Sequence, residues 1–453
     1  MSRQRGNADQ RADTRQRRRP PSPPALWRIA LPALLLLAAC ATAPATPRTP
    51  AAPAIGWKGN LHTHSLWSDG TDFPEMIVAW YHDHGYNFLS LTEHDLLQRD
   101  ERWVDVEAED AGWPPRNASA RRALPGYRDR FGVDWVEERA LPNGHLVRLR
   151  LLEEYRERFE RPGAFLLIEG EEITDAAGTH VNALNPEVAI RPQGGESAAE
   201  RIRSNVLAVA AQERRLRRPM AAIVNHPNFT WAWTAEDIAA VPEARLFEVY
   251  NGHLLVNNAG DSLHASSEQI WDVALALRHA AGDPPLYAVA TDDAHDYREY
   301  GDTISRTGRG WVMVRTALLH PDSIMNALEA GRFYASTGVA IRTESHDAEG
   351  MRIEIDAEPG VTYRTRFIGT RTDVPLDGEP VLDADGDTLR TTMRYDERVG
   401  EVLAEVEGAV AEYRFQGDER YVRAQVTSSQ PHLDPTTGMP LGIQQAWLQP
   451  VFR

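Results

Sequence analysis

Cysteine is almost absent from this chain of 453 residues, in which Cys40 is the only one. A single cysteine excludes an intramolecular disulfide bond, and it excludes a zinc site built from cysteine thiolates. Any metal site in this protein would therefore depend on histidine and carboxylate side chains.

Positive charge is also scarce. The chain has 49 lysines and arginines against 66 aspartates and glutamates, which gives a formal net charge of -17 at pH 7. A surface that is this acidic argues against non-specific nucleic-acid binding, and we expect no nucleic-acid partner. The charge does not exclude a phosphorylated substrate, because bound cations can reverse the sign of the charge inside a cleft.

The clearest apolar run, residues 29–39, is shorter than the roughly 20 residues that a helix needs to cross a bilayer. It follows a basic stretch that includes Arg28, and it ends at Leu37-Ala38-Ala39-Cys40. This arrangement resembles a bacterial lipoprotein signal, in which Cys40 is lipidated and becomes the mature N-terminus. An ordinary secretory signal with a chance cysteine is the alternative. We expect residues 1–40 to be the signal segment, and Ala41 favours a lipid-anchored, periplasm-facing protein of the outer membrane within the bacterial cell envelope.

The remaining chain changes character three times. Residues 41–56 are rich in alanine, proline and threonine and predict a flexible tether. Residues 57–340 alternate short apolar runs with amphipathic segments, which predicts an α/β domain. Residues 98–161 interrupt this alternation, either as a lid over the site or as an excursion with its own small core. Residues 341–453 predict a β-rich C-terminal domain of sandwich-like, all-β type, because short strands alternate with turn residues.

The sequence His62-Thr63-His64 begins the α/β region, and Asp69-Gly70 follows it. If residues 61–65 form a strand, His62 and His64 project from the same face, because side chains alternate along a strand. The turn at Asp69-Gly70 can bring a carboxylate back toward them. Two imidazoles and a carboxylate make half of a metal site, so the rest of the chain must supply the other ligands.

Further metal-type side chains follow other short apolar runs. We expect strands at residues 88–92, 164–168, 221–224 and 286–290, and each leads into histidines or carboxylates. These residues are His94, Glu172, His180, His226, Asp293 and His295. With His62, His64 and Asp69 they make nine side chains, too many for one tetrahedral ion and enough for two or three divalent ions. Histidine and carboxylate ligands without thiolates suit zinc, manganese or iron.

These motifs resemble those of the polymerase and histidinol phosphatase (PHP) domain superfamily. The resemblance runs from about residue 57 to residue 339. It is carried by His62-Thr63-His64 with Ser68-Asp69-Gly70, Thr92-Glu93-His94-Asp95, Gly170-Glu171-Glu172-Ile173-Thr174, Asn225-His226-Pro227, Asp293-Ala294-His295 and Gly331-Arg332-Phe333-Tyr334. It implies a distorted (β/α)7 barrel with a trinuclear metal site at the carboxyl ends of the strands.

The resemblance also implies how the ligands divide among three ions. One ion would be held by His62, His64, Glu172 and Asp293; a second by Glu172, His180 and His226; and a third by Asp69, His94 and His295. The family spacing selects Glu172 over Glu169 and Glu171 as the bridging carboxylate. His180 has an alternative reading as a surface-loop histidine. No catalytic side chain beyond the metal ligands is implied.

Two positions depart from the family pattern. This chain has Glu93 where the family usually has aspartate, and Thr291-Asp292 where it usually has glycine and serine. Neither change removes a ligand. We expect both to alter the groups that surround the ligands, and hence the metal affinity.

The sequence therefore predicts a metal-dependent phosphoesterase, in which a hydroxide that bridges two ions attacks phosphorus in line. Arg306 and Arg309 follow the last ligand pair and are candidates for gripping a substrate phosphate; exposed loop arginines are the alternative. We expect a small phosphorylated substrate and no protein partner.

Two other functions are compatible with the sequence. One is a metal hydrolase of the cell envelope that acts on a non-phosphate bond, such as an amide or a glycan-linked ester. The other is a non-catalytic, lipid-anchored module whose β-rich region binds polysaccharide, although the complete ligand set argues against it.

Overall fold

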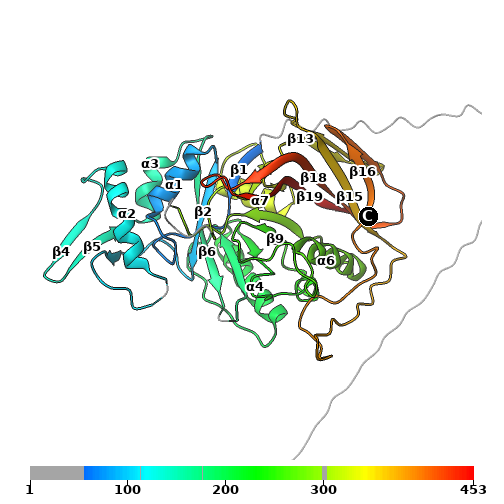
Figure 1. Ribbon diagram of the computed structural model, residues 1–453, viewed down its shortest axis with the longest axis horizontal. Helices are drawn as coiled ribbons and strands as arrows, with labels where there is room; N and C mark the ends of the chain where they lie inside the picture. Colours follow the sequence, from blue (N-terminus) through cyan, green and yellow to red (C-terminus); the bar gives the residue numbers. More distant parts are fainter. Residues whose placement is uncertain (1–55, 113, 176, 298–303) are drawn as a thin grey trace, which may run out of the picture. The chain divides into compact units, whose positions relative to one another are not determined.

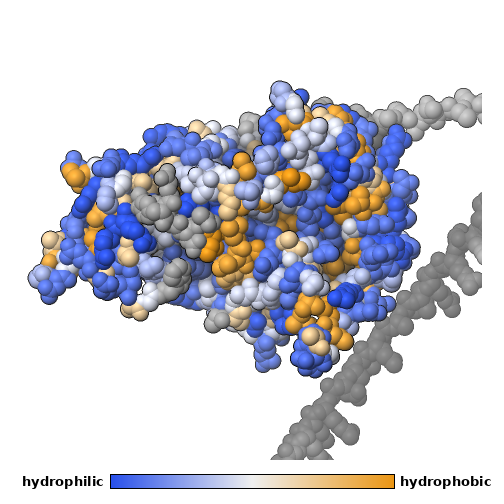
Figure 2. Space-filling view, viewed as in Figure 1, coloured by the Kyte–Doolittle hydropathy of each residue, from blue (hydrophilic) through white to orange (hydrophobic). Residues whose placement is uncertain are grey.

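The structure is a computed structural model that describes residues 56–112, 114–175, 177–297 and 304–453. The predicted signal segment 1–40, with Cys40, and all of the predicted tether except residue 56 lie outside the described residues. Within the described part of the chain, no helix combines the length and the apolar character that a membrane span requires. Figure 2 shows that the face seen in this view is mainly hydrophilic, in keeping with the net charge of -17.

The described chain alternates strands and helices up to β12 and then continues as strands. The strands of the first part are β1 (Gly56–Asn60), β2 (Phe88–His94), β3 (Arg102–Asp105), β4 (Glu138–Leu141), β5 (Gly144–Leu149), β6 (Leu166–Thr174), β7 (His180–Leu184), β8 (Ala221–Val224), β9 (Leu246–Asn251), β10 (Tyr287–Thr291), β11 (Trp311–Arg315) and β12 (Phe333–Ser336). The helices are α1 (Pro74–Asp83), α2 (Arg116–Phe131), α3 (Leu152–Phe159), α4 (Ala198–Leu216), α5 (Ala235–Ala239), α6 (Ser267–Ala281) and α7 (Pro321–Glu329). The later strands are β13 (Ile341–His346), β14 (Gly350–Ile355), β15 (Tyr363–Arg371), β16 (Glu401–Glu407), β17 (Val410–Arg414), β18 (Glu419–Leu433) and β19 (Pro440–Phe452).

One large sheet organises the molecule. Its strand order is β10-β9-β8-β7-β6-β2-β1-β11-β12-β19-β18-β15-β16. The pairs β1–β2, β2–β6, β8–β9 and β9–β10 are parallel, whereas β7 and the strands from β11 onward pair antiparallel. The α/β fold class predicted from the sequence is therefore confirmed as a mixed α/β fold with a large central sheet.

Helix boundaries follow the local sequence chemistry. Pro74 occupies the first turn of α1, where its missing N–H and fixed φ are tolerated. Thr234 caps α5, accepting a hydrogen bond from the amide of Asp237, whose side chain reaches back to the Thr234 amide. These two reciprocal hydrogen bonds form a capping box at the start of α5.

The first strand ends earlier than expected. A strand over residues 61–65 was the condition under which His62 and His64 would share a face. This condition is not met: β1 stops at Asn60, where the chain leaves the sheet, and Thr63 makes only an isolated parallel bridge to Ala294. Even so, His62 and His64 stay close, with ring centroids 5.2 Å apart.

The insertion at residues 98–161 has a small sheet of its own, in the order β3-β5-β4, with α2 beside it (Figure 1). Its apolar side chains, including Val104 and Tyr127, share a core with Leu66, Trp67 and Phe73 from the segment that follows the first histidines. The Tyr127 and Phe73 rings stack at 4.1 Å. The insertion is thus anchored directly on the segment that carries His64 and Asp69.

The β-rich region at residues 341–453 contributes to two sheets. β13, β14 and β17 form a separate three-stranded sheet, whereas β15, β16, β18 and β19 extend the large sheet from β12. Side chains of both sheets, such as Ile353 and Phe367, share one core, which gives a sandwich-like arrangement. The domain boundary at residue 341 stays a prediction.

A buried ion pair ties the β18–β19 turn to the α/β part. Arg309 Nε and Nη2 lie 2.9 and 2.8 Å from Asp434 Oδ2, and both side chains are fully buried. The same guanidinium donates from Nη1 to the carbonyls of Gly252 and Ile304, at 2.7 and 2.8 Å. Removing one partner of such a pair leaves an uncompensated charge in the interior.

Asp434→Ala should therefore lower the free energy of unfolding by about 3–5 kcal/mol. Urea unfolding followed by circular dichroism measures this loss. The matched control is Asp418→Ala, because Asp418 pairs with Arg371 at the surface and should contribute about 1 kcal/mol or less. Equal losses for the two variants would contradict a special role for the buried pair.

Candidate metal centre

The nine predicted ligands converge at the ends of the strands. His62, His64 and Asp69 come from the segment after β1, His94 ends β2, Glu172 lies in β6, His180 begins β7, His226 follows β8, and Asp293 and His295 follow β10. Four groups of these side chains place their ligand atoms within 4.8 Å of one another: His64, Asp69, His94 and His295; His62, His64 and Glu172; His62, His226 and Asp293; and His94, Glu172 and His180. The structure therefore brings together every residue that the strand-end pattern selected.

Glu172 lies at the centre of the cluster and is only 1% exposed. Its Oε1 is 3.1 Å from His180 Nδ1 and 3.2 Å from His226 Nε2, and its Oε2 is 3.0 Å from His94 Nδ1. The two nearby glutamates of β6 are engaged elsewhere: Glu169 binds Arg99, and Glu171 accepts a hydrogen bond from the amide of Ile190. Only Glu172 of the three is placed to bridge ions.

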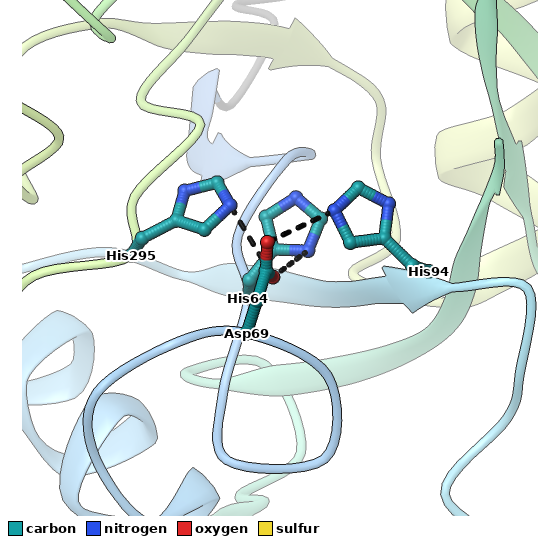
Figure 3. Close-up of side chains that lie close together, drawn as sticks. All are labelled: His64, Asp69, His94 and His295. Atoms are coloured by element: carbon teal, nitrogen blue, oxygen red, sulfur yellow. Dashed lines mark ion pairs between the residues drawn. The ribbon is translucent and has the colours of Figure 1, made fainter. Parts of the chain in front are cut away.

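Asp69 is the centre of a second group, drawn in Figure 3. Its carboxylate lies 3.3 Å from His94 Nε2, 3.4 Å from His295 Nε2 and 3.6 Å from His64 Nδ1. Gly70 makes this return possible, since a Cβ there would lie 2.4 Å from the carbonyl oxygen of His64. The tight turn after His64 thus delivers the carboxylate to the imidazoles.

Asp293 and His226 hold their places with strained backbones. Their φ angles are 48° and 24°, in the left-handed region that costs a non-glycine residue roughly 1–3 kcal/mol. The amide of Asp293 donates to the carbonyl of His62, and its Oδ1 lies 3.2 Å from His62 Nε2. Local strain is thus retained at two of the predicted ligands.

Glu248, on β9, supports the cluster from behind and was missed by the sequence analysis. Its carboxylate is buried and lies 2.7 Å from His62 Nδ1, 2.7 Å from the amide of His226, 2.8 Å from Asn251 Nδ2 and 2.6 Å from Thr291 Oγ1. An ionised carboxylate only accepts, so His62 Nδ1 donates and its Nε2 faces Glu172 and Asp293. Its place in an apolar run, Leu246-Phe247-Glu248-Val249, was the available signal.

The two departures from the family pattern serve as buried anchors. Glu93 accepts hydrogen bonds from the side chains of Ser65, Ser68 and Gln98, and so fixes the turn that carries Asp69. Asp292 accepts the backbone amides of residues 308, 309 and 310 and the hydroxyl of Tyr81. Both carboxylates therefore shape the loops around the cluster, as expected.

Electrostatics hold the carboxylates of the cluster ionised. Burial raises the pKa of Glu172, but the neighbouring histidines, led by His180, outweigh burial and hold this pKa well below its usual range. Burial, together with the like charges of His295 and His94, lowers the pKa of His64 to about 3. Ionised carboxylates and neutral imidazoles are the forms that bind divalent cations. Although burial lowers the pKa of the imidazoles, the carboxylates outweigh it and raise the pKa of His62, His94, His226 and His295, so cations that bound there would displace protons.

The residues also fit metal ions by what they leave unpaired. His62 Nε2 and His64 Nε2 are buried and have no hydrogen-bond partner among the described residues. Both point at carboxylates, His62 Nε2 at 3.3 Å from Glu172 Oε1 and His64 Nε2 at 3.4 Å from Asp293 Oδ1. Buried polar atoms normally have hydrogen-bond partners, so two unpaired nitrogens that face carboxylates fit the role of metal ligands.

A cavity of about 680 Å³ opens onto the cluster. Its walls combine the metal-type side chains with residues of other segments. The described lining residues are Asp69, Thr71, His94, Pro115, Ser119, Arg122, Glu172, Thr174, His180, His226, Phe229, His253, Leu255, Asp293, His295, Asp296, Ile304 and Ser305. Three of these belong to α2 or its start, so the insertion forms part of the cavity wall. Its apolar side chains share their core with the segment after the first histidines, and its action as a lid stays a prediction.

The two predicted phosphate-binding arginines lie elsewhere. Arg306 and Arg309 are 1% and 0% exposed, and neither is among the described residues that line the cavity. Arg309 instead pairs with Asp434. The predicted grip on a substrate phosphate is therefore wrong for Arg309 and has no support for Arg306.

His253 lines the cavity but was not selected from the sequence. It follows β9, so the strand-end rule that found the other histidines applied to it as well. Its Nδ1 accepts a hydrogen bond from the amide of Leu255, and burial lowers its pKa to about 4. A neutral imidazole with Nδ1 as acceptor carries its proton on Nε2.

Known structures resemble this fold. Its structural neighbours include PHP-like metal-dependent phosphoesterases. A two-domain protein from Bacteroides vulgatus containing a predicted PHP-like metal-dependent phosphoesterase is 16% identical, with a TM-score of 0.36, covering 86% of this chain and 96% of that chain. A candidate metal-dependent phosphoesterase from Bifidobacterium adolescentis is 11% identical, with a TM-score of 0.27, covering 55% and 92%.

A third match is an amidohydrolase from Chromobacterium violaceum, solved with bound sulfate and no metal, which is 13% identical with a TM-score of 0.23 and covers 55% of this chain and 93% of that chain. No protein-family model and no curated protein matches the sequence. Because these TM-scores are below 0.5, the evidence for the metal centre comes from this chain's own side chains.

Glu248→Gln should weaken metal binding about 10–100-fold, because the substitution removes the charge that orients His62. Titration of zinc or manganese against a competing chelator measures the change. Glu169→Gln is the matched control: it also removes a buried carboxylate charge, but from a side chain paired with Arg99 instead of a histidine. An affinity that falls equally in both variants would contradict the orienting role.

Proposed function

We propose that this protein is a metal-dependent phosphoesterase. The convergence of nine histidine and carboxylate side chains from separate strand ends carries the proposal, since two of the buried nitrogens lack hydrogen-bond partners among the described residues and the cluster faces a cavity. The carboxylates and imidazoles would hold two or three divalent ions of zinc, manganese or iron. Bound ions would activate water as a nucleophile and neutralise the charge that develops on the phosphate oxygens.

The ligand assignment is part of the proposal. Glu172 would bridge ions, because five histidine nitrogens lie within 3.5 Å of its two oxygens. His64 would bind one ion through Nε2, which faces Glu172 and Asp293, because a neutral imidazole offers one ligand nitrogen; its Nδ1 would keep the proton and face Asp69. This assignment follows the division that the family resemblance implies, in which His64 belongs to one ion.

We also propose that the strands of the α/β part close into a distorted barrel with the metal centre at its mouth. Side chains of β2, β6, β7, β8, β9, β10, β11 and β12 meet in one apolar cluster, which α7 completes. The bridge between Thr63 and Ala294 joins the segments after β1 and β10. A packed interior and a site at the strand ends are the features of such barrels.

The cellular location remains a proposal that rests on the leader sequence alone. We propose a lipid anchor at Cys40 and a periplasm-facing position, which would place the metal centre where small phosphorylated molecules of the envelope can reach it. Labelling with a radioactive fatty acid in cells, with Cys40→Ser as the control, tests this location.

Phosphate release from a panel of monoesters and diesters, assayed with added manganese or zinc beside an amide panel, tests the reaction class. His64→Ala should lower kcat/KM by at least about 100-fold, because the imidazole faces all three carboxylates of the cluster. His82→Ala is the control, since His82 is exposed on α1. A metal-loaded protein that is inert on esters and hydrolyses amides would exclude the proposal.

Adding the metal should also raise the Tm of the wild-type protein in a concentration-dependent way, because an ion that binds only the folded state stabilises it. A free metal concentration of 100 times Kd should raise the free energy of unfolding by about 2.7 kcal/mol. Differential scanning calorimetry measures the shift, and elemental analysis gives the number of ions bound. The double variant His62→Ala, His64→Ala should lose most of the Tm shift and most of the bound ions. A full Tm shift in that variant would place the ions elsewhere.

A further inference from the structure

The insertion contributes a positively charged side chain, Arg122, to the cavity. Pro115, Ser119 and Arg122, all at or near the start of α2, line the cavity beside the metal-type residues. Among the described lining residues, Arg122 is the only arginine or lysine. The carboxylates of the lining are Asp69, Glu172, Asp293 and Asp296.

The position of Arg122 is set by a folded core. Asp110 accepts the amides of Asn117 and Ala118 at 2.7 and 2.9 Å and so fixes the first turn of α2. Further along the helix, Tyr127 donates to the buried carboxylate of Glu75 at 2.6 Å. Because α2 is held at both places, the wall that it forms keeps a defined position relative to the metal centre.

The side chain of Arg122 is oriented as well. Its Nη2 donates to Ser119 Oγ at 3.2 Å, and Ser119 lies one helical turn earlier and is only 3% exposed. Both residues line the cavity. A guanidinium presents a planar fork of N–H donors that matches a phosphate or carboxylate group in two-point contact.

Apolar side chains complete the cavity. Phe229, Leu255 and Ile304 lie in its lining together with Arg122 and the metal-type residues. The volume of about 680 Å³ is typical of pockets that enclose a whole small molecule. The cavity therefore offers three kinds of contact: cation-binding ligands, an apolar surface and one arginine.

We propose that Arg122 binds a second anionic group of the substrate, apart from the phosphate ester that is cleaved. The substrate class is then a small phosphate ester in which an apolar part separates the scissile ester from a second phosphate or carboxylate. This assignment rests on the proposed phosphoesterase function, and it makes the insertion the element that determines specificity.

Bisphosphates of straight-chain diols with two to six carbons, each compared with the monophosphate of the same length, test the assignment. The wild-type protein should prefer the bisphosphate, by kcat/KM, for at least one chain length. Arg122→Ala should reduce that preference about 10–100-fold, which corresponds to the loss of a charge-assisted, two-point contact. Arg122→Lys should restore part of it, since it keeps the charge but not the planar fork.

Arg130→Ala is the matched control, because Arg130 lies on the same helix but is exposed and paired with Asp83. It should leave the preference unchanged. A preference that is the same in wild type and Arg122→Ala at every chain length would overturn the assignment, as would an equal loss in Arg130→Ala.

Calorimetric binding of the same compounds to the metal-loaded protein separates this proposal from the proposed function. A protein that binds the bisphosphates through Arg122 but releases no phosphate would contradict the phosphoesterase function and leave the arginine site intact. Turnover of monophosphates and bisphosphates with no dependence on Arg122, in rate or in binding, would contradict the arginine site alone.

Discussion

The concentration of negative charge in a packed interior is the constraint on which this structure depends. Asp69, Glu172 and Asp293 lie within one cluster, and neighbouring histidines hold the pKa of each carboxyl well below its usual range although burial raises it. Burying an unpaired carboxylate costs far more free energy than a small domain can spare. The surrounding imidazoles and the cations that they are arranged to bind offset this cost.

The cluster explains why the structure retains strained backbones and buried carboxylates, which lower its stability. The left-handed backbones of His226 and Asp293 cost free energy, and they are retained because the surrounding contacts of Glu248 and His62 fix those positions. The buried Glu93 and Asp292 bind several donors each, so their charges are satisfied while they fix the loops that carry Asp69 and follow Asp293. Strain and buried charge are thus confined to the ends of the strands, where the ligands are.

The sequence could predict these residues because most of them follow a short apolar run, although Glu172 lies within β6 and His180 begins β7. Parallel strands bring their carboxyl ends to one edge, so residues far apart in the chain meet there. The orientation of the His64 ring was beyond the sequence, since it depends on which nitrogen faces which carboxylate. His253 shows that the rule was applied incompletely, because it also follows a strand and also lines the cavity.

The prediction for Arg309 failed because its partner lies far away in the sequence. Arg309 lies close to the last ligands in sequence, but its direction is set by Asp434, which belongs to the turn between β18 and β19. That guanidinium binds the carbonyls of Gly252 and Ile304, which neighbour His253 and Ser305 in the cavity wall. This buried ion pair therefore couples the β-rich region to two loops of the cavity wall. Sequence proximity alone would assign such an arginine to the substrate, whereas its burial assigns it to holding two cavity loops in place.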